Sequence, residues 1–155
     1  MAKKKLKPGM QAPAFEGVDQ KGKKISLDTF AGKKLILYFY PKDDTPTCTK
    51  EACNLRDNFS MLKRKKYAVI GVSPDGEKSH KKFADKFTLP FPLLADEELK
   101  AIKAYGVWGK KKLYGREYMG VIRTTFVIDE KGVIESIIED VDSADHANQI
   151  LELQN

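Results

Sequence analysis

The sequence predicts an α/β fold in which helices flank a central mixed β-sheet, and two patterns carry this prediction. The first begins with two apolar runs, 35–40 and 67–73, which are rich in aromatic and β-branched residues and have the length of buried strands. Between them, from 46 to 66, apolar residues recur every three or four positions, which is the helical period. Strand, helix and strand in this order predict a βαβ unit with parallel strands.

The second pattern is a predicted antiparallel hairpin in the last third of the chain. Its strands are 124–129 and 133–138, and a tight turn at 130–132 that ends in Gly132 joins them. The last segment, 142–153, has apolar residues at helical spacing, and Ser143 is the expected N-cap of that helix. The hairpin and the final helix therefore supply the second half of the fold.

The order of these elements is that of a thioredoxin-like fold. Two further helices are expected at 77–87 and 99–105, and the segment before residue 35, including 25–27, is expected to add N-terminal extension strands. The chain has 155 residues, which is enough to bury one core, and it contains no repeat or linker. We therefore expect a single domain over 1–155.

Composition points to a globular cytoplasmic protein. Hydrophobic residues make up 41% of the chain and charged residues 32%. Two cysteines are too few for a disulfide framework. The basic N-terminus is followed by no apolar segment of the secretory type, and the apolar run at 35–40 is too short to cross a bilayer. In a reducing cytosol both thiols would start reduced.

The positive charge does not by itself indicate a nucleic-acid partner. The net charge is +6, and lysines gather at 3–5, 63–66 and 110–112. Single-stranded nucleic acid is usually bound by basic grooves interleaved with stacking aromatic residues, and this interleaving is missing. Solvated helix faces and loops are the favoured interpretation of the lysines.

The two cysteines, Cys48 and Cys53, lie directly behind the first apolar run. Thr45 and Pro46 suit the opening of a helix, because threonine is a good N-cap and proline at the first position loses no hydrogen bond. Cys48 then falls in the first turn, where unpaired N–H groups and the helix dipole favour a thiolate. The sequence therefore predicts a nucleophilic cysteine at a helix start.

The spacing of Cys48 and Cys53 constrains how they could react. Residues five apart in a helix are separated by about 140° around the axis and about 7.5 Å along it, so their Cα atoms lie roughly 8.5 to 9 Å apart. Disulfides rarely tolerate more than ~7 Å. A disulfide between these cysteines would require the first turns to unwind, unlike the Cys-x-x-Cys motif of dithiol exchange proteins.

These residues resemble the peroxiredoxins. Pro41, Thr45 and Cys48 match the pattern Pro-x-x-x-Thr-x-x-Cys, and the stretch 38–53 resembles the peroxiredoxin Q subgroup, the bacterioferritin comigratory proteins. The likeness continues over nearly the whole chain, at 55–57, 72–75, 89–96, 105–109 and 122–129. One departure is Thr47, where the subgroup commonly has glycine; it removes no catalytic group.

The resemblance assigns roles by position. It implies that Cys48 is the peroxidatic cysteine, that Thr45 holds the peroxide, and that Arg123 stabilises the thiolate and the charge developing on the leaving oxygen. Pro41 would shield the thiolate from solvent. Glu51 either anchors an arginine or the helix start, or is a plain surface glutamate, and its spacing from Cys48 leaves these options open.

The resemblance also implies that Cys53 is the resolving cysteine of an atypical two-cysteine peroxidase. It would form an intramolecular disulfide with Cys48, and the family's usual reductant is thioredoxin. Hydrogen peroxide and small organic hydroperoxides are the expected substrates, with no cofactor, and a monomer is the simplest assembly. Aromatic residues Phe39 and Tyr40 lie near Pro41, so one of them is a candidate wall of the peroxide pocket.

Other functions use the same residues differently. A protein dithiol–disulfide oxidoreductase or redox sensor would use both cysteines, and a nucleic-acid binder would use the lysines. Cys48, Cys53, His80 and His146 could be counted as zinc ligands, but the cysteines face different sides of one helix. Both histidines are expected on the surface of helices, so no metal site is expected.

Overall fold

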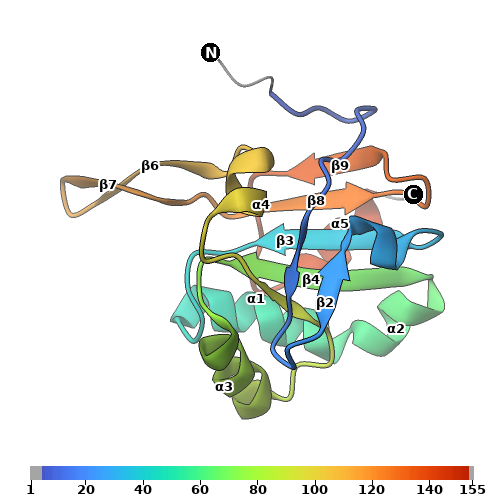
Figure 1. Cartoon of the computed structure of the whole chain (residues 1–155), viewed down its shortest axis with the longest axis horizontal. Helices are drawn as coiled ribbons and strands as arrows, with labels where there is room; N and C mark the ends of the chain where they lie inside the picture. The colour runs from blue at the N-terminus through green and yellow to red at the C-terminus, as the bar shows by residue number, and fades with distance from the viewer. Residues whose placement is uncertain (1–4, 154–155) are drawn as a thin grey trace.

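The computed structural model describes residues 5–153. Its centre is a five-stranded mixed sheet in the order β5-β4-β3-β8-β9 (Figure 1). The strands are β3 (Lys34–Phe39), β4 (Tyr67–Ser73), β5 (Leu93–Ala95), β8 (Thr124–Ile128) and β9 (Ile134–Ile138). Strand β3 pairs in parallel with β4 and antiparallel with β8, which confirms both the βαβ unit and the later hairpin. The predicted thioredoxin-like α/β fold is therefore confirmed.

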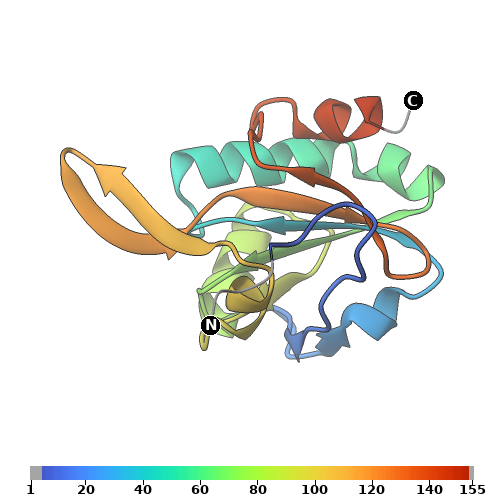
Figure 2. The ribbon, with the colours of Figure 1, turned by 90° about the horizontal axis from the view of Figure 1, so that it is seen from above.

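Helices cover both faces of this sheet. Figure 2 shows α1 (Pro46–Asp57), α2 (Phe59–Arg64) and α5 (His146–Glu152) on one face, and α4 (Lys100–Ala104) with the N-terminal segment on the other. Helix α3 (Glu77–Phe87) packs beside the edge strand β5. Two separate apolar cores result, because alternate residues of each central strand point to opposite faces.

The long helix predicted over 46–66 is wrong as one element. It is interrupted at Asn58, where the backbone leaves the helical region with φ −106° and ψ 9°. The side-chain amide of Asn58 donates to the main-chain carbonyl of Asn54 at 2.8 Å. Such local side-chain bonds compete with the regular hydrogen bonds of a helix. The result is two shorter helices, α1 and α2.

The final helix is shorter than the predicted 142–153. Helix α5 begins at His146, with Asp145 rather than Ser143 at the N-cap position. The preceding loop is held by Gln149, which accepts from the Asp142 N–H at 2.9 Å and donates to the Asp140 carbonyl at 2.7 Å. These bonds satisfy polar groups of the loop without extending the helix.

The other two predicted helices fared differently. The prediction 77–87 has the same bounds as the observed α3. The predicted helix 99–105 is shortened to α4, because the backbone of Leu99 is left-handed with φ 62°.

Two small hairpins lie outside the central sheet. Strands β1 (Glu16–Val18) and β2 (Lys24–Ser26) form the expected N-terminal extension, followed by the short 3-10 helix η1 (Leu27–Phe30). Strands β6 (Trp108–Leu113) and β7 (Arg116–Val121) form a second hairpin that the sequence analysis missed. Its turn residues, Tyr114 and Gly115, both have positive φ, as tight hairpin turns often require.

Within residues 5–153, none of the helices has the length and apolar character needed to span a bilayer.

Candidate active site

The candidate site lies where β3 leads into α1. Thr45 is the N-cap residue and Pro46 the first helical residue, as the sequence predicts. The expected capping bond is absent, because the Thr45 hydroxyl instead donates to the carbonyl of Lys42 at 2.8 Å. Only the Thr45 carbonyl joins the helix, by accepting from the Thr49 N–H at 2.8 Å. The first turn of α1 therefore begins without side-chain capping.

Cys48 is buried in that first turn, with 1% of its surface exposed. Arg123, from the segment between β7 and β8, donates through Nη2 to the Cys48 sulfur at 3.1 Å. Its Nη1 donates to Glu51 Oε1 at 2.6 Å. Of the three options left open for Glu51, the arginine anchor is the observed one. The structure also brings the predicted residues Cys48 and Arg123 into contact.

Burial and neighbouring charges shift the pKa values of Arg123 and Glu51. Burial alone would lower the pKa of Arg123, but the neighbouring Glu51 and Cys48 outweigh burial and raise that pKa above its usual value. Burial raises the pKa of Glu51 from 4.5 to about 7, and Arg123 opposes this rise. Arg123 thus stays cationic and is fixed by a carboxylate from one side while it faces the sulfur with the other.

His146 lies behind Glu51, fully buried rather than on the surface as expected. Its Nε2 is 2.7 Å from the Thr125 hydroxyl and 3.4 Å from Glu51 Oε2, and its Nδ1 is 2.8 Å from Gln149 Oε1. Burial lowers the pKa of His146, so the ring is neutral near pH 7. In that form Nδ1–H donates to Gln149 and Nε2 accepts from Thr125.

His80 is the second histidine that proves to be buried, with no exposed surface. Its Nδ1 lies 2.7 Å from Asp43 and its Nε2 lies 2.9 Å from the Leu94 carbonyl. Asp43 also accepts from the Tyr40 hydroxyl at 2.6 Å and from Ser79 at 2.8 Å. Asp43 therefore ties the loop before Cys48 to α3 and to Tyr40, the residue that follows β3.

The aromatic residues near the site serve mainly as core. Tyr40 is buried and its hydroxyl turns to Asp43, while Phe39 packs in the apolar core on the α4 side of the sheet. Pro41 is half-buried at the start of the loop. Sequence reasoning missed Asp43, His80 and His146, since nothing in a single sequence shows which polar helix residues face inward.

Cys53 is half-buried in the same helix as Cys48, and both thiols are free. Because α1 is continuous from Pro46 to Asp57, the helical spacing argument applies as predicted. Among residues 5–153, no three His, Cys, Asp or Glu side chains are grouped so that they could hold a metal ion.

The fold and the site together define a thioredoxin-like protein with a buried cysteine at a helix start that faces an arginine. The sequence model of the AhpC/TSA family matches residues 8–137. The chain is 44% identical to "Putative peroxiredoxin bcp" of Coxiella burnetii, over 94% of this chain and 97% of that protein. It is 41% identical to "Peroxiredoxin Bcp" of Escherichia coli strain K12, over 94% of each.

Solved structures agree with this placement. The bacterioferritin comigratory protein of Xanthomonas campestris superposes with a TM-score of 0.84 at 31% identity, covering 90% of each chain. Peroxiredoxin Q of Xylella fastidiosa gives a TM-score of 0.90 at 27% identity, over 97% of this chain and 96% of that one. The chain therefore belongs to the AhpC/TSA family, in its Bcp/PrxQ subgroup of peroxiredoxins, and is a thiol peroxidase.

Proposed function

We propose that Cys48 is the peroxidatic cysteine and Cys53 the resolving cysteine of an atypical two-cysteine peroxidase. The contact of Arg123 Nη2 with the Cys48 sulfur, at 3.1 Å, carries this proposal. A half-buried cation in contact with a cysteine sulfur favours the thiolate, which is the nucleophilic form. Cys53 is the only other cysteine in the chain, so it is the only one that can resolve the oxidised Cys48 within the molecule.

In the first step the Cys48 thiolate attacks one peroxide oxygen and the O–O bond breaks. Cys48 becomes a sulfenic acid, and the leaving oxygen takes a proton to give water or an alcohol. Arg123 stabilises the charge that develops on that oxygen. The Thr45 hydroxyl donates its hydrogen bond to the Lys42 carbonyl, so its oxygen can still accept a hydrogen bond from the peroxide. Pro41 shields the sulfur from solvent.

In the second step the Cys53 thiol attacks the sulfenic sulfur, a disulfide forms and water leaves. A partner dithiol, with thioredoxin as the proposed donor, then returns both cysteines to thiols and becomes a disulfide itself. Hydrogen peroxide and small organic hydroperoxides are the proposed substrates; the Xanthomonas campestris relative is described by its alkyl peroxide reduction activity. We propose that the chain acts without a cofactor as a cytoplasmic monomer, with 1–155 as one domain.

The test compares three proteins in peroxide consumption with dithiothreitol and in mass after one equivalent of hydrogen peroxide. The wild type should form an intramolecular disulfide, Cys53→Ser should trap a sulfenic acid on Cys48, and Cys48→Ser should be inert. Peroxide consumption by Cys48→Ser at the wild-type rate would overturn the assignment. If the wild type exchanged disulfides with protein thiols but did not consume peroxide, it would be a dithiol–disulfide oxidoreductase.

A further inference from the structure

The β6–β7 hairpin stands apart from the rest of the molecule. Its two strands pair with each other and with no other strand among residues 5–153. Figures 1 and 2 show it projecting beyond the central sheet as an arm. An isolated two-stranded hairpin is marginally stable in water, so an arm of this kind gains from a covering surface.

Exposed apolar side chains are concentrated on this arm. Six large hydrophobic residues are exposed in the described part of the chain, and five of them fall within ten residues of one another. We call these five the hairpin patch: Leu113, Tyr114, Tyr118, Met119 and Ile122. Tyr114 at the tip is 97% exposed. A cluster of this kind on a soluble protein usually marks a binding surface.

The hairpin patch is surrounded by positive charge. The arm carries Lys110, Lys111, Lys112 and Arg116 against the single acid Glu117. A second copy of the chain would bring the same cations and a net charge of +6 toward them, which opposes self-association. The charge complements a partner whose docking face is acidic around an apolar centre.

The base of the arm adjoins the active site. Strand β7 ends at Val121, two residues before Arg123, and the Lys111 ammonium donates to the Val121 carbonyl at 2.9 Å. Burial and Arg123 lower the pKa of Lys111, and Cys48 acts in the opposite direction, so this lysine feels the charges of the site. A partner on the arm would therefore sit close to the segment that holds Arg123.

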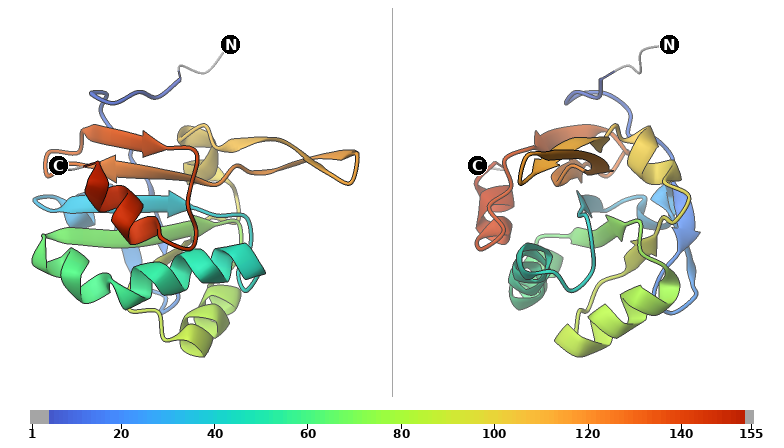
Figure 3. Two further views of the ribbon diagram at one scale, coloured as in Figure 1. Left: turned by 180° about the vertical axis from the view of Figure 1, so that it is seen from behind. Right: turned by 90° about the vertical axis from the view of Figure 1, so that its left-hand side faces the viewer.

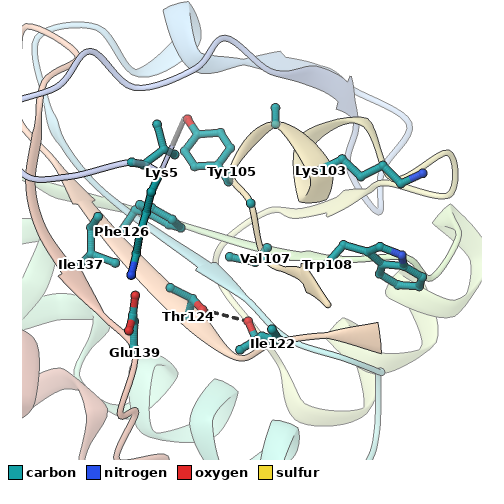
Figure 4. A pocket seen from close by; sticks show the side chains of 13 residues that line it. Lys5, Lys103, Tyr105, Val107, Trp108, Ile122, Thr124, Phe126, Ile137 and Glu139 are labelled. Atoms are coloured by element: carbon teal, nitrogen blue, oxygen red, sulfur yellow. Dashed lines mark hydrogen bonds between the residues drawn. The ribbon is translucent and has the colours of Figure 1, made fainter. Parts of the chain in front are cut away.

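A cavity of about 880 Å³ opens at the same base. Figure 4 shows Trp108 and Ile122 lining it beside Val107, with Thr124 bonded to the Ile122 carbonyl. Ile122 belongs both to the cavity wall and to the hairpin patch. Ile122 thus connects the arm to a cavity on the α4 side of the sheet, and Arg123, the next residue, reaches Cys48 on the α1 side.

We propose that the hairpin patch docks the acidic face of the protein dithiol that reduces the Cys48–Cys53 disulfide. This inference rests on the proposed function. In the reduction, one partner thiolate attacks the disulfide and the second partner thiol displaces it, so this chain gains two thiols and the partner leaves as a disulfide. Docking on the arm holds the partner beside the segment where the disulfide forms.

The test separates docking from chemistry by changing the reductant. The variant Leu113→Ser/Tyr114→Ser is assayed with hydrogen peroxide and either thioredoxin, thioredoxin reductase and NADPH, or dithiothreitol. Removing two apolar anchors should raise the KM for thioredoxin about tenfold or more. The KM for hydrogen peroxide and the turnover with dithiothreitol should stay at wild-type values. The control is Leu153→Ser, which removes the sixth exposed hydrophobic side chain, far from the arm. It should leave both KM values and the turnover with dithiothreitol unchanged.

A second pair of variants tests the charge. Lys110→Glu/Lys112→Glu should raise the KM for thioredoxin and flatten its dependence on salt, because screened attraction to an acidic face is lost. Lys78→Glu/Lys82→Glu makes the same net change on exposed positions of α3 and should leave both properties as in the wild type.

Three results would overturn the docking proposal. The KM for thioredoxin could be unchanged in the arm variants, or turnover with dithiothreitol could fall in parallel, which would mean a damaged site. Sedimentation could show a dimer that Leu113→Ser/Tyr114→Ser dissociates, which would assign the patch to a second copy. Failure of the proposed function looks different: the wild type itself would not turn over peroxide with dithiothreitol.

Discussion

The two halves of α1 are held in place by different kinds of contact. In the first half, 46–52, the polar anchors are the Cys48 sulfur and the Glu51 carboxylate, and both are bound by Arg123. In the second half, Asn54 exchanges hydrogen bonds with the loop and start of α5, and Arg56 donates to the Phe87 carbonyl at 2.7 Å. Figure 3 shows α5 lying beside α1 in front of the sheet.

This difference in contacts predicts which half of α1 unwinds when Cys48 is oxidised. In the proposed mechanism, oxidation of Cys48 changes the sulfur that Arg123 contacts, and the first turn has no side-chain cap to replace that contact. The contacts of Asn54 and Arg56 involve no reacting atom, so we expect them to persist through the reaction. Local opening should therefore start at Pro46 and carry Cys48 toward a Cys53 that stays in place.

The largest expected effect comes from removing the anchor of the first half. Arg123→Met in a Cys53→Ser background should slow sulfenic acid formation by about 10²- to 10³-fold, because a preorganised donor to the developing charge is lost. Rapid-mixing kinetics of Cys48 oxidation by hydrogen peroxide measures this rate. Arg116→Met makes the same change on the exposed arm and should keep the parent rate. Equal rates in the two variants would contradict the role of Arg123.

Glu51, in the first half of α1, should make the stability of the fold depend on pH. Its pKa is raised from 4.5 to about 7 by burial, so the folded state retains a proton that the unfolded state has lost. The wild type should therefore lose stability relative to Glu51→Gln as pH rises from 4.5 to about 7, by on the order of 3 kcal/mol. Urea unfolding of both proteins across this range measures the difference. Parallel stability curves would contradict the buried, proton-retaining Glu51.

Asn54→Ala removes the anchor of the second half. It deletes two hydrogen bonds to the α5 region and should lower the free energy of unfolding by about 1 to 3 kcal/mol. Sulfenic acid formation at Cys48 should keep its rate, since Arg123 is untouched. Chemical denaturation measures the first effect, and Asn148→Ala, an exposed single-bond asparagine on α5, serves as the control. A slower peroxide step in Asn54→Ala would mean that the two halves are not independent.

The smallest expected effect comes from Thr47→Gly, which tests the departure from the subgroup pattern. Glycine in the first turn should destabilise the helix by only about 0.3 kcal/mol relative to threonine, which is itself a weak helix former. Disulfide formation should become faster, and less sulfinic acid should accumulate on Cys48 at high peroxide. Ser60→Gly makes a similar loss in α2 and should change neither quantity. Mass spectrometry of the oxidised forms supplies the measurement, and more sulfinic acid in Thr47→Gly would oppose the account.

The parts of the fold that the sequence predicted are those with strong apolar periodicity. Strands β3 and β4 and helix α3 have this signal, and α3 has the predicted bounds. The β6–β7 hairpin lacked it, because lysines fill half of β6 and neither face of the arm is buried against the core. Its Tyr114-Gly115 turn was the one local signal available.

The candidate site divides in the same way. Cys48, Thr45 and Arg123 belong to motifs whose residue types and spacing could be recognised in the chain, and the structure places Arg123 on the Cys48 sulfur. His80 and His146 were expected on the surface and are buried instead. Their burial depends on Asp43 and Glu51, which approach them only in the folded chain. Such pairings arise from tertiary contacts that no spacing within a helix encodes.

Amide hydrogen exchange in α1, compared between the reduced protein and the Cys48–Cys53 disulfide form, tests the central claim most directly. The account predicts that amides of the first half lose protection on oxidation while those from Asn54 to Asp57 keep theirs. A Cys53→Ser variant treated in the same way should keep more of its first-half protection than the disulfide form. A disulfide that forms with the first half still protected, or with the second half opening instead, would contradict it.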